Sequence, residues 1–368
     1  MARSVAAFTD LYLPTINGVT YTIKLWRDCW SRRNGRMSVI YPYVDGYEPD
    51  LDEHPVRSVR APLYRQYRLG VPRVPDDLDR PEVVHAHTPF SLGVAAMRFA
   101  RREDVPLVAS YHTVLSERSD HVVSGETLAS GLRRASRHYE RWFFDAADLI
   151  VTPTSTTREY IVEKIEPNGP VEVLSNGIDV EFFRPTDAEE FRELYGLADA
   201  APLLGYTGRL SPEKNLEAAI DAVAGTNATL VLGGDGPARS ELEAYAHTKG
   251  ADVRFLGFLD RSDLPAFYSA LDVFVFPSPL ETQGLVALEA NACGTPVVAV
   301  DAGALSDTVI EGETGYHYPP GDVDGFRAAI ARTLADRDRL SDLCLRRRRM
   351  ISVEHTMDRL ETLYESVS

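Results

Sequence analysis

Short apolar runs alternate with longer amphipathic segments along the whole chain. In the first half, these runs predict buried strands at Ser4–Phe8, Met37–Tyr41, Val83–Ala86, Leu107–Tyr111, Leu149–Thr152 and Val171–Leu174. The segments between them carry apolar residues three and four positions apart, a spacing typical of helices that bury one face. Strands that alternate with helices predict a mostly parallel sheet that is covered on both faces.

The second half of the chain repeats this plan. Its predicted strands are Leu203–Thr207, Thr229–Gly233, Val253–Phe255, Val273–Phe276, Pro296–Val300 and Gly315–Tyr318, and its predicted helices include Asn215–Ala224, Arg239–Lys249 and Leu285–Cys293. We therefore expect two doubly wound α/β domains, residues 1–183 and 184–350, and a C-terminal helix over 351–368. Ligands of such open sheets bind at the carboxyl ends of the strands, so a cleft between two facing domains is the expected site.

Length and composition agree with this organisation. The 368 residues exceed one ordinary core and fit two domains of about 150–200 residues. The sequence holds no apolar run long enough for a transmembrane helix, and its N-terminal stretch is too short and too soon polar for a signal peptide. The cysteines, Cys29, Cys293 and Cys344, are far apart and indicate neither disulfides nor a zinc site. A cytoplasmic protein is expected.

The charge of the chain narrows the choice of partners. The net charge is −16, with the acidic excess in the second half, and nearly all the positive charge is arginine. A strongly acidic surface that stays solvated is typical of salt-adapted, halophilic proteins. The same acidity makes nucleic acid an unsuitable partner.

Two loops that follow predicted strands carry groups suited to a diphosphate. In the first, Gly18 opens a helix whose N-terminus could face phosphate with only backbone in the way, although an ordinary turn explains it equally well. In the second, Arg209 and Lys214 flank a short loop after a strand. Two cations that reach one spot would neutralise a leaving diphosphate, and a solvated loop is the alternative.

A third loop carries a pair of glutamates. Glu281 lies after a predicted strand, and Glu289 lies about two turns into the apolar helix that follows. A carboxylate among core-facing residues needs a partner, which ribose hydroxyls or a buried salt bridge would supply. The helix N-terminus at Gly284–Val286 would offer backbone N–H groups to phosphate.

The glutamate pair, with seven residues between its members, resembles that of the retaining glycosyltransferases of family 4. Further blocks match this family in the same order: His85–Pro89, Tyr111–Thr113, Ser175–Asp179, Gly208–Asn215, Gly233–Pro237 and Ala292–Val298. The resemblance covers nearly the whole chain. It implies an α/β protein of the GT-B fold, with two doubly wound, Rossmann-like domains facing a central cleft and the C-terminal helix returning to the N-terminal domain.

The resemblance also implies roles for the matching residues. The catalytic set would be His112, Glu281, Arg209 and Lys214, in which the two cations stabilise the leaving diphosphate. The donor would be bound by these cations and by Gly18, Glu281, Gln283, Gly284, Leu285 and Glu289, with Glu289 on the ribose. Asp10, Tyr64 and Tyr67 could line the acceptor side.

The family implies a reaction without metal or other cofactor, in which a nucleotide-diphosphate sugar is the co-substrate. The histidines have no carboxylate close to them in the sequence, so a metal site is not expected there. The family retains the configuration of the anomeric carbon. Without a well-placed nucleophilic carboxylate, this retention implies a front-face attack, in which the leaving phosphate oxygen takes the proton of the acceptor.

A basic, aromatic segment bears on the acceptor. Within Leu128–Phe144, apolar residues recur at helical spacing beside Arg133, Arg134, Arg137, Arg141 and Trp142, and Tyr64 and Tyr67 stand next to further arginines. Basic helices with an aromatic face bind anionic membranes, whereas a surface helix with a solvated basic side is the plain alternative. The stretches Glu281–Val286 and His87–Gly93 also look similar to the branch of the family that glycosylates diacylglycerol-type lipids.

The sequence thus predicts transfer of a hexose, with UDP-glucose favoured as donor, to a membrane lipid of diacylglycerol or archaeal ether type. A monomer in peripheral contact with the inner face of the cell membrane is expected. Alternatives are a soluble sugar or lipid-linked glycan as acceptor, and a GDP-mannose-dependent mannosyltransferase. A phosphorylase or epimerase of the same fold and a non-catalytic nucleotide-sugar binder are more distant alternatives.

Overall fold

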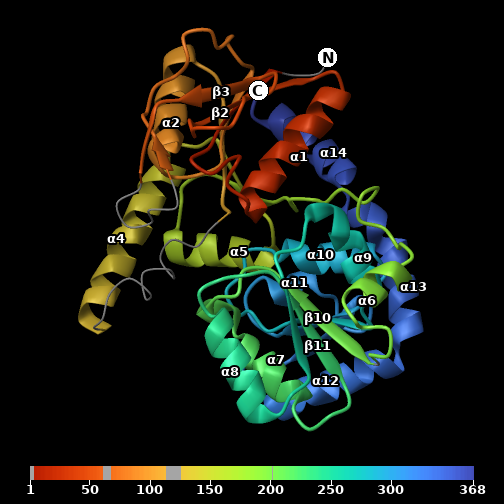
Figure 1. Ribbon diagram of the computed structural model, residues 1–368. Coiled ribbons are helices and arrows are strands. Elements are labelled where there is room, and N and C mark those ends of the chain that lie inside the picture. The colour runs from red at the N-terminus through yellow and green to blue at the C-terminus, as the bar shows by residue number, and fades with distance from the viewer. Residues whose placement is uncertain (1–3, 61–67, 113–125, 201) are drawn as a thin grey trace. The chain divides into compact units, whose positions relative to one another are not determined.

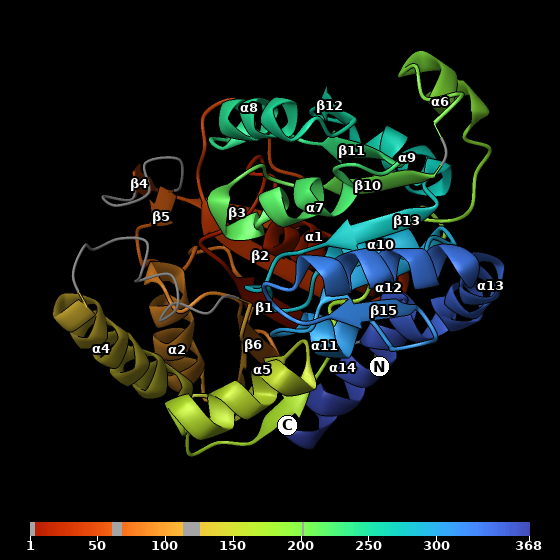
Figure 2. The ribbon, with the colours of Figure 1, turned by 90° about the horizontal axis from the view of Figure 1, so that it is seen from below.

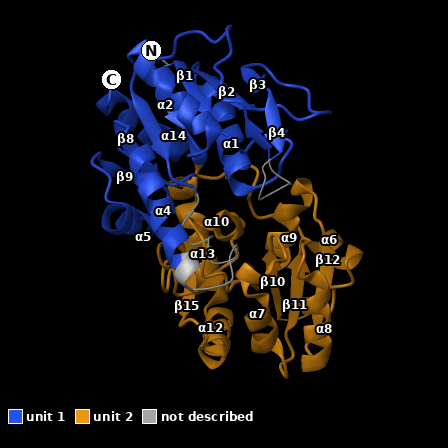
Figure 3. Ribbon diagram, turned by 90° about the vertical axis from the view of Figure 1, so that its left-hand side faces the viewer, with its two compact units in different colours: residues 1–176, 353–368 blue, residues 177–352 orange. Residues whose placement is uncertain are grey.

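The computed structural model describes residues 4–112 apart from 61–67, and residues 126–368 apart from 201. The chain forms two compact units, which we name unit 1, Met1–Asn176 with Val353–Ser368, and unit 2, Gly177–Ser352 (Figure 3). The chain passes from unit 1 into unit 2 after Asn176, which is earlier than the expected domain boundary at 183/184. The reason is that Ile178 and Phe183 are buried in the core of unit 2, where Ile178 forms a parallel bridge with Ser352.

Unit 1 contains a seven-stranded parallel sheet. Its strands, in spatial order, are β3 (Glu53–Val56), β2 (Arg36–Pro42), β1 (Ser4–Phe8), β6 (Val83–Ala86), β7 (Leu107–Ser110), β8 (Leu149–Thr152) and β9 (Val171–Val173). A short hairpin, β4 (Ser58–Arg60) and β5 (Arg68–Gly70), accompanies the sheet. The strand order reverses between β1 and β6, so the loops after these two strands meet.

Helices cover both faces of this sheet. Alternate residues of the strands enter one core with Leu92 and Phe99 of α2 (Ser91–Glu103), or the opposite core with Trp26 of α1 (Gly18–Arg32) and Met357 of α14 (Val353–Ser366). Figure 1 shows α14 beside α1. The C-terminal helix therefore belongs to unit 1, as the family resemblance implies. The remaining helical segments are α4 (Glu126–Phe144), α5 (Ser155–Tyr160) and a π-helical turn (Ile161–Ile165).

Unit 2 contains a six-stranded parallel sheet. Its spatial order is β12 (Val253–Gly257), β11 (Thr229–Gly233), β10 (Leu203–Thr207), β13 (Val273–Phe276), β14 (Val297–Val300) and β15 (Gly315–Tyr318). The order reverses between β10 and β13, so this is where the loops that carry the candidate cations and glutamates come together.

The helices of unit 2 enclose one continuous core. On one face of the sheet lie α7 (Leu216–Val223) and α12 (Val323–Ala335), and on the other lie α9 (Leu264–Ala270) and α10 (Leu285–Ala292) (Figure 2). The other helices are α6 (Glu189–Leu194), α8 (Arg239–Lys249), α11 (Leu305–Thr308) and α13 (Arg337–Arg347), and Pro212–Lys214 forms a 3₁₀ turn after β10. Within the described ranges, no helix is both long and apolar enough to cross a membrane.

Candidate active site

A salt bridge joins the two loops at the reversal point of unit 2. The Lys214 Nζ lies 2.6 Å from the Glu281 Oε1, and the two side chains are 20% and 17% exposed. The loops are also joined by the side chain of Asn215, which donates to the Pro277 carbonyl at 3.4 Å. Asn215 has a left-handed backbone that ends the 3₁₀ turn and begins α7. This geometry holds a cation and a carboxylate side by side at the carboxyl ends of β10 and β13.

Arg209 lies on an exposed part of the same loop, just after β10. Its loop is held by backbone bonds to the segment after β11: the Gly208 N–H donates to the Gly233 carbonyl and the Leu210 N–H to the Asp235 carbonyl, each at 3.0 Å. A Cβ on Gly234 would lie 2.0 Å from the Gly208 oxygen, and φ of Gly234 is +125°. Glycine there permits the close approach that fixes the path of the Arg209 backbone.

The charges of this loop favour ionised acids. Burial raises the pKa of the Glu213 carboxyl, but hydrogen bonds from Ser211 and from backbone, with the charges of Lys214 and Arg209, lower that pKa below its usual range. The loop therefore already acts as a cationic environment for a nearby carboxylate. The same charges would act on a phosphate.

Glu289 lies on α10 and is paired with a buried tyrosine of α9. The Tyr268 hydroxyl donates to the Glu289 Oε2 at 2.6 Å. Burial raises the pKa of the Glu289 carboxyl, and the Tyr268 hydrogen bond and the charge of Arg261 oppose this shift. Only one oxygen of the carboxylate is used by Tyr268, so the other can accept from a hydroxyl such as that of a ribose.

The start of α10 is built for close packing. Gly284 has a φ of +79°, and a Cβ there would lie 2.8 Å from atoms of Phe276 and Leu305. Gln283 is buried, and its backbone carbonyl accepts from the Thr308 hydroxyl. Leu285 is the first residue of the helix, and the N-cap residue, Gly284, has no side chain to cap it. The backbone N–H groups of this turn thus form an end suited to an anion.

In unit 1, two of the candidate histidine positions are brought together. His87 follows β6 and His112 follows β7, and the His87 Nδ1 lies 3.1 Å from the His112 Nε2. Burial lowers the pKa of His112 to about 4 and that of His87 well below its usual value, so both rings are neutral near pH 7. Both line a small pocket together with Leu11, Val19, Thr88 and Phe90.

Asp10 lies where the loops after β1 and β6 meet. Its carboxylate is buried, and both of its oxygens accept hydrogen bonds. It accepts from the Gly70 N–H at 3.0 Å, the Ser91 hydroxyl at 2.8 Å, the Leu92 N–H at 2.9 Å and the Thr88 hydroxyl at 3.2 Å. Burial raises the pKa of Asp10, while these hydrogen bonds lower it. Its carboxylate caps the first turn of α2, a structural task that the sequence did not suggest.

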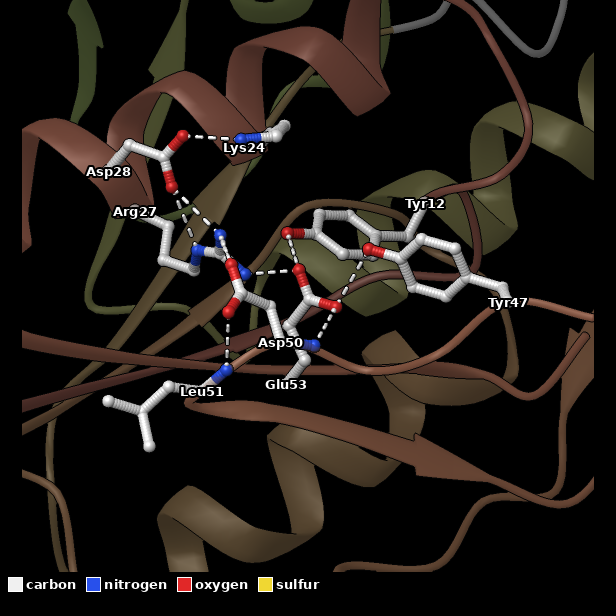
Figure 4. A network of polar contacts seen from close by, with 8 residues as sticks. All are labelled: Tyr12, Lys24, Arg27, Asp28, Tyr47, Asp50, Leu51 and Glu53. Carbon is white, nitrogen blue, oxygen red and sulfur yellow. Dashed lines mark hydrogen bonds and ion pairs between the residues drawn. The ribbon is translucent and has the colours of Figure 1, made fainter.

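Gly18 is the first residue of α1 and is exposed, and Asn17 caps this helix by accepting from the Thr20 N–H at 3.0 Å. The loop before it is anchored by a buried carboxylate, shown in Figure 4. Glu53 accepts from the Tyr12 hydroxyl at 2.9 Å and the Tyr47 hydroxyl at 2.8 Å, and forms an ion pair with Arg27 of α1. The loop that carries Gly18 is thereby held to α1 and β3.

The residues predicted to bind membrane lie on α4. Tyr64 and Tyr67, which were predicted on the acceptor side, fall outside the described residues. Trp142 is 49% exposed and its ring lies 5.6 Å from that of Tyr139. Arg134 is exposed and Arg133 and Arg137 are half-buried. Arg141 is shared between Glu166 at 3.4 Å and Asp145 at 3.8 Å. The basic ladder is therefore partly neutralised at its C-terminal end.

Two family models match the chain. The model described as Glycosyltransferase Family 4 matches residues 16–182, and the model described as Glycosyl transferases group 1 matches residues 187–351. A GDP-mannose-dependent alpha-mannosyltransferase of Mycolicibacterium smegmatis is 32% identical over 91% of this chain and 90% of its own. A sulfoquinovosyl transferase of Arabidopsis thaliana is 32% identical over 77% of this chain and 56% of its own.

Solved structures share the architecture. The sucrose-phosphate synthase of Thermosynechococcus elongatus has a TM-score of 0.81 at 22% identity, covering 99% of this chain and 98% of that one. This likeness shows the GT-B fold, with its paired parallel sheets. The family matches and the extent of the mannosyltransferase similarity show, in addition, that the chain belongs to the group 1 and family 4 glycosyltransferases, which use nucleotide sugars.

Proposed function

We propose that this protein is a retaining hexosyltransferase whose donor is held by unit 2. The observation that carries the proposal is the Lys214–Glu281 contact of 2.6 Å at the reversal point of the sheet. A diphosphate beside Arg209 and Lys214 would meet two cations, and its departure would be stabilised where charge develops. Glu281 would accept from hydroxyls of the donor sugar, and Glu289 from those of the ribose.

The proposed chemistry is a single exchange at the anomeric carbon. The bond from that carbon to the diphosphate oxygen breaks, and a bond to the acceptor oxygen forms on the same face of the sugar. The acceptor proton moves to the leaving phosphate oxygen, so no separate base is required. His112 is proposed as a further catalytic residue from unit 1, on the strength of the family resemblance, and neither a metal nor another cofactor takes part.

For the donor, we propose UDP-glucose, with GDP-mannose as the second candidate. The second is favoured by the relative that is 32% identical over 91% of this chain, whose name specifies GDP-mannose. Both nucleotides present the same diphosphate to Arg209 and Lys214, so these residues do not distinguish them. The base must be recognised by other groups of the unit.

For the acceptor, we propose a membrane lipid of diacylglycerol or archaeal ether type. This is supported by α4, on which Leu132, Tyr139 and Trp142 are 37%, 38% and 49% exposed beside arginines. Exposed aromatic and cationic side chains on one helix are suited to the interface of an anionic bilayer. The enzyme would then act as a monomer at the inner face of the membrane. A soluble sugar or a lipid-linked glycan is the alternative acceptor.

A transfer assay that crosses donors with acceptors tests the proposal. UDP-glucose and GDP-mannose are each offered in high salt, with and without vesicles of polar lipids, and the anomeric configuration of the product is read by NMR. Glycolipid that keeps the donor configuration is the expected product. Transfer to soluble sugars alone would remove the lipid acceptor, and an inverted product would remove the mechanism. Nucleotide binding without any transfer would indicate a non-catalytic binder.

A further inference from the structure

A column of buried polar rings connects the C-terminal helix to His112. At its base, the His85 side chain is fully buried on β6, with its Nδ1 2.6 Å from the Tyr364 hydroxyl of α14 and its Nε2 2.8 Å from the Ser110 hydroxyl. Both ring nitrogens of His85 are thus occupied. The orientation of the ring is fixed by one residue of β7 and one residue of α14.

The next two rings lie on top of this fixed base. The ring of His87 stacks on that of His85 at 4.1 Å between centroids and 21° between planes, and His112 follows at 5.4 Å and 11°. The edge of the Trp26 indole closes one side, with its centroid 5.7 Å from that of His87. His87 therefore has little freedom to tilt, and its Nδ1 remains 3.1 Å from the His112 Nε2.

The contact between His87 and His112 has a chemical consequence. Burial keeps both rings neutral, so each has one N–H and one bare nitrogen. One of the two nitrogens in contact must donate and the other must accept, which couples the tautomer of His112 to that of His87. The remaining nitrogen of His112 then presents either an N–H or a lone pair to its surroundings, according to the tautomer of His87.

We propose that Tyr364 is a positioning residue, which holds His112 in one orientation through the column His85–His87–His112. This inference rests on the proposed function, because it gives His112 a task in the transfer. It assigns to α14 a role beyond packing: the hydroxyl of Tyr364 is the outermost fixed point of the polar column. The residue is not expected to touch the substrate.

The test compares Tyr364→Phe with Tyr41→Phe. Tyr41 is a buried tyrosine of the same unit whose hydroxyl has no hydrogen-bond partner among the described residues, so its removal controls for the loss of a buried hydroxyl. Imidazole ¹⁵N NMR of the protein without substrate reads the tautomer of each ring directly. We expect Tyr364→Phe to shift the His112 nitrogens and lower kcat roughly fivefold with little change in donor KM, and Tyr41→Phe to do neither.

A double variant separates positioning from general damage. If Tyr364 acts through His112, Tyr364→Phe should have no further effect on the residual activity of His112→Ala. Additive losses, or unchanged His112 signals in Tyr364→Phe, would overturn the proposal. The NMR result does not depend on transfer, so a failed transfer assay would count against the proposed function alone. Should Tyr364→Phe not fold, Ser110→Ala removes the opposite hydrogen bond of His85 and must give the same His112 shift.

Discussion

The Lys214 ammonium and the Glu281 carboxylate lie 2.6 Å apart, although they are 67 positions apart in the sequence. Each is mostly buried, so each neutralises the other in an environment where an unpaired charge is costly. The residue proposed to bind phosphate and the residue proposed to bind sugar hydroxyls thus form one ion pair. Substitution of either must alter the electrostatics of the other.

Lys214→Ala should lower kcat/KM by about 100-fold or more, because a cation at the leaving diphosphate is worth roughly 3 kcal/mol in the transition state. Steady-state kinetics with saturating acceptor measures this loss. Lys249→Ala is the matched control, since Lys249 forms a 2.7 Å ion pair with Asp221 on the surface of the same unit. Comparable losses in both variants would mean that Lys214 acts through general charge and not at the site.

Tyr268→Phe should weaken nucleotide binding without unfolding the protein. The variant keeps the ring in the core and removes the 2.6 Å bond to Glu289, so the carboxylate is less well oriented toward ribose. We expect Kd for the nucleoside diphosphate to rise about tenfold by calorimetry, corresponding to a hydrogen bond of roughly 1.4 kcal/mol. Tyr245→Phe, which removes a 2.9 Å bond to Asp221, should leave Kd unchanged. Equal Kd values in all three proteins would exclude Glu289 from the ribose contact.

Gly234→Ala should impair both folding and donor binding. The added Cβ would lie 2.0 Å from the Gly208 oxygen, so the backbone that carries Arg209 would have to move. Gly225→Ala is the control, because φ of Gly225 is also positive, at +77°, but no atom lies within 4 Å of its added Cβ. Both should lose stability from backbone strain of about 1 kcal/mol in a chemical-denaturation experiment. Only Gly234→Ala should also raise the donor Kd.

The buried histidines should make the protein less stable in mild acid. Burial lowers the pKa of His85 to about 3 and of His112 to about 4, from 6.5. Between pH 6.5 and about 4, the unfolded chain therefore binds more protons than the folded one, and the free energy of unfolding falls as pH falls. Each such ring contributes a slope of up to about 1.4 kcal/mol per pH unit. Asp10 and Glu289, whose carboxyl pKa values are raised by burial, act in the opposite direction.

Because these effects overlap, the measurement is a difference between variants. Urea unfolding of His87→Gln at several pH values between 7 and 5 should show a shallower loss of stability than the unmodified protein. His247→Gln replaces an exposed histidine and should reproduce the unmodified slope. If His87→Gln and His247→Gln gave the same slope, the buried rings could not be the source of the acid sensitivity.

The exposed face of α4 should determine binding to anionic vesicles. The double variant Arg134→Glu with Trp142→Ala removes an exposed cation and an aromatic side chain that is 49% exposed. Sedimentation with anionic vesicles at low salt should show at least a fivefold loss of partitioning, since each arginine near such a surface contributes about 1 kcal/mol. Arg346→Glu makes the same charge change in unit 2 and should bind normally. Unaltered partitioning of the double variant would assign α4 to packing alone.

Much of the fold could be predicted from the sequence because central parallel strands are apolar on both faces. Val83–Ala86 and Thr229–Gly233, for example, have the predicted bounds. The edge strand β3 was not predicted, because Glu53-His54-Pro55-Val56 contains no apolar run. The first crossing between the units was placed too late, since nothing local shows that Ile178 pairs with Ser352.

Part of the candidate site could likewise be predicted from the sequence. The Gly208–Asn215 loop and the two glutamates were candidates because their residue types suit phosphate and sugar, and the structure brings Lys214 and Glu281 together, while their roles stay predictions. Tyr268 was missed, since an aromatic residue in an apolar helix has the pattern of a core residue, and only the structure shows its hydroxyl on Glu289. The contact of His85 with Tyr364 joins residues 279 positions apart, and no spacing rule could reveal it.

The return of α14 to unit 1 has a consequence for synthesis on the ribosome. Val353, Met357, Leu360 and Tyr364 fill one core of unit 1, yet they are translated after all of unit 2. Unit 2, whose residues are contiguous, can complete its core while the nascent N-terminal segment still lacks a helix. The N-terminal segment is therefore made first but finishes folding last. Until α14 emerges from the ribosome, the apolar face of this segment that α14 covers in the folded protein is exposed to chaperones and proteases.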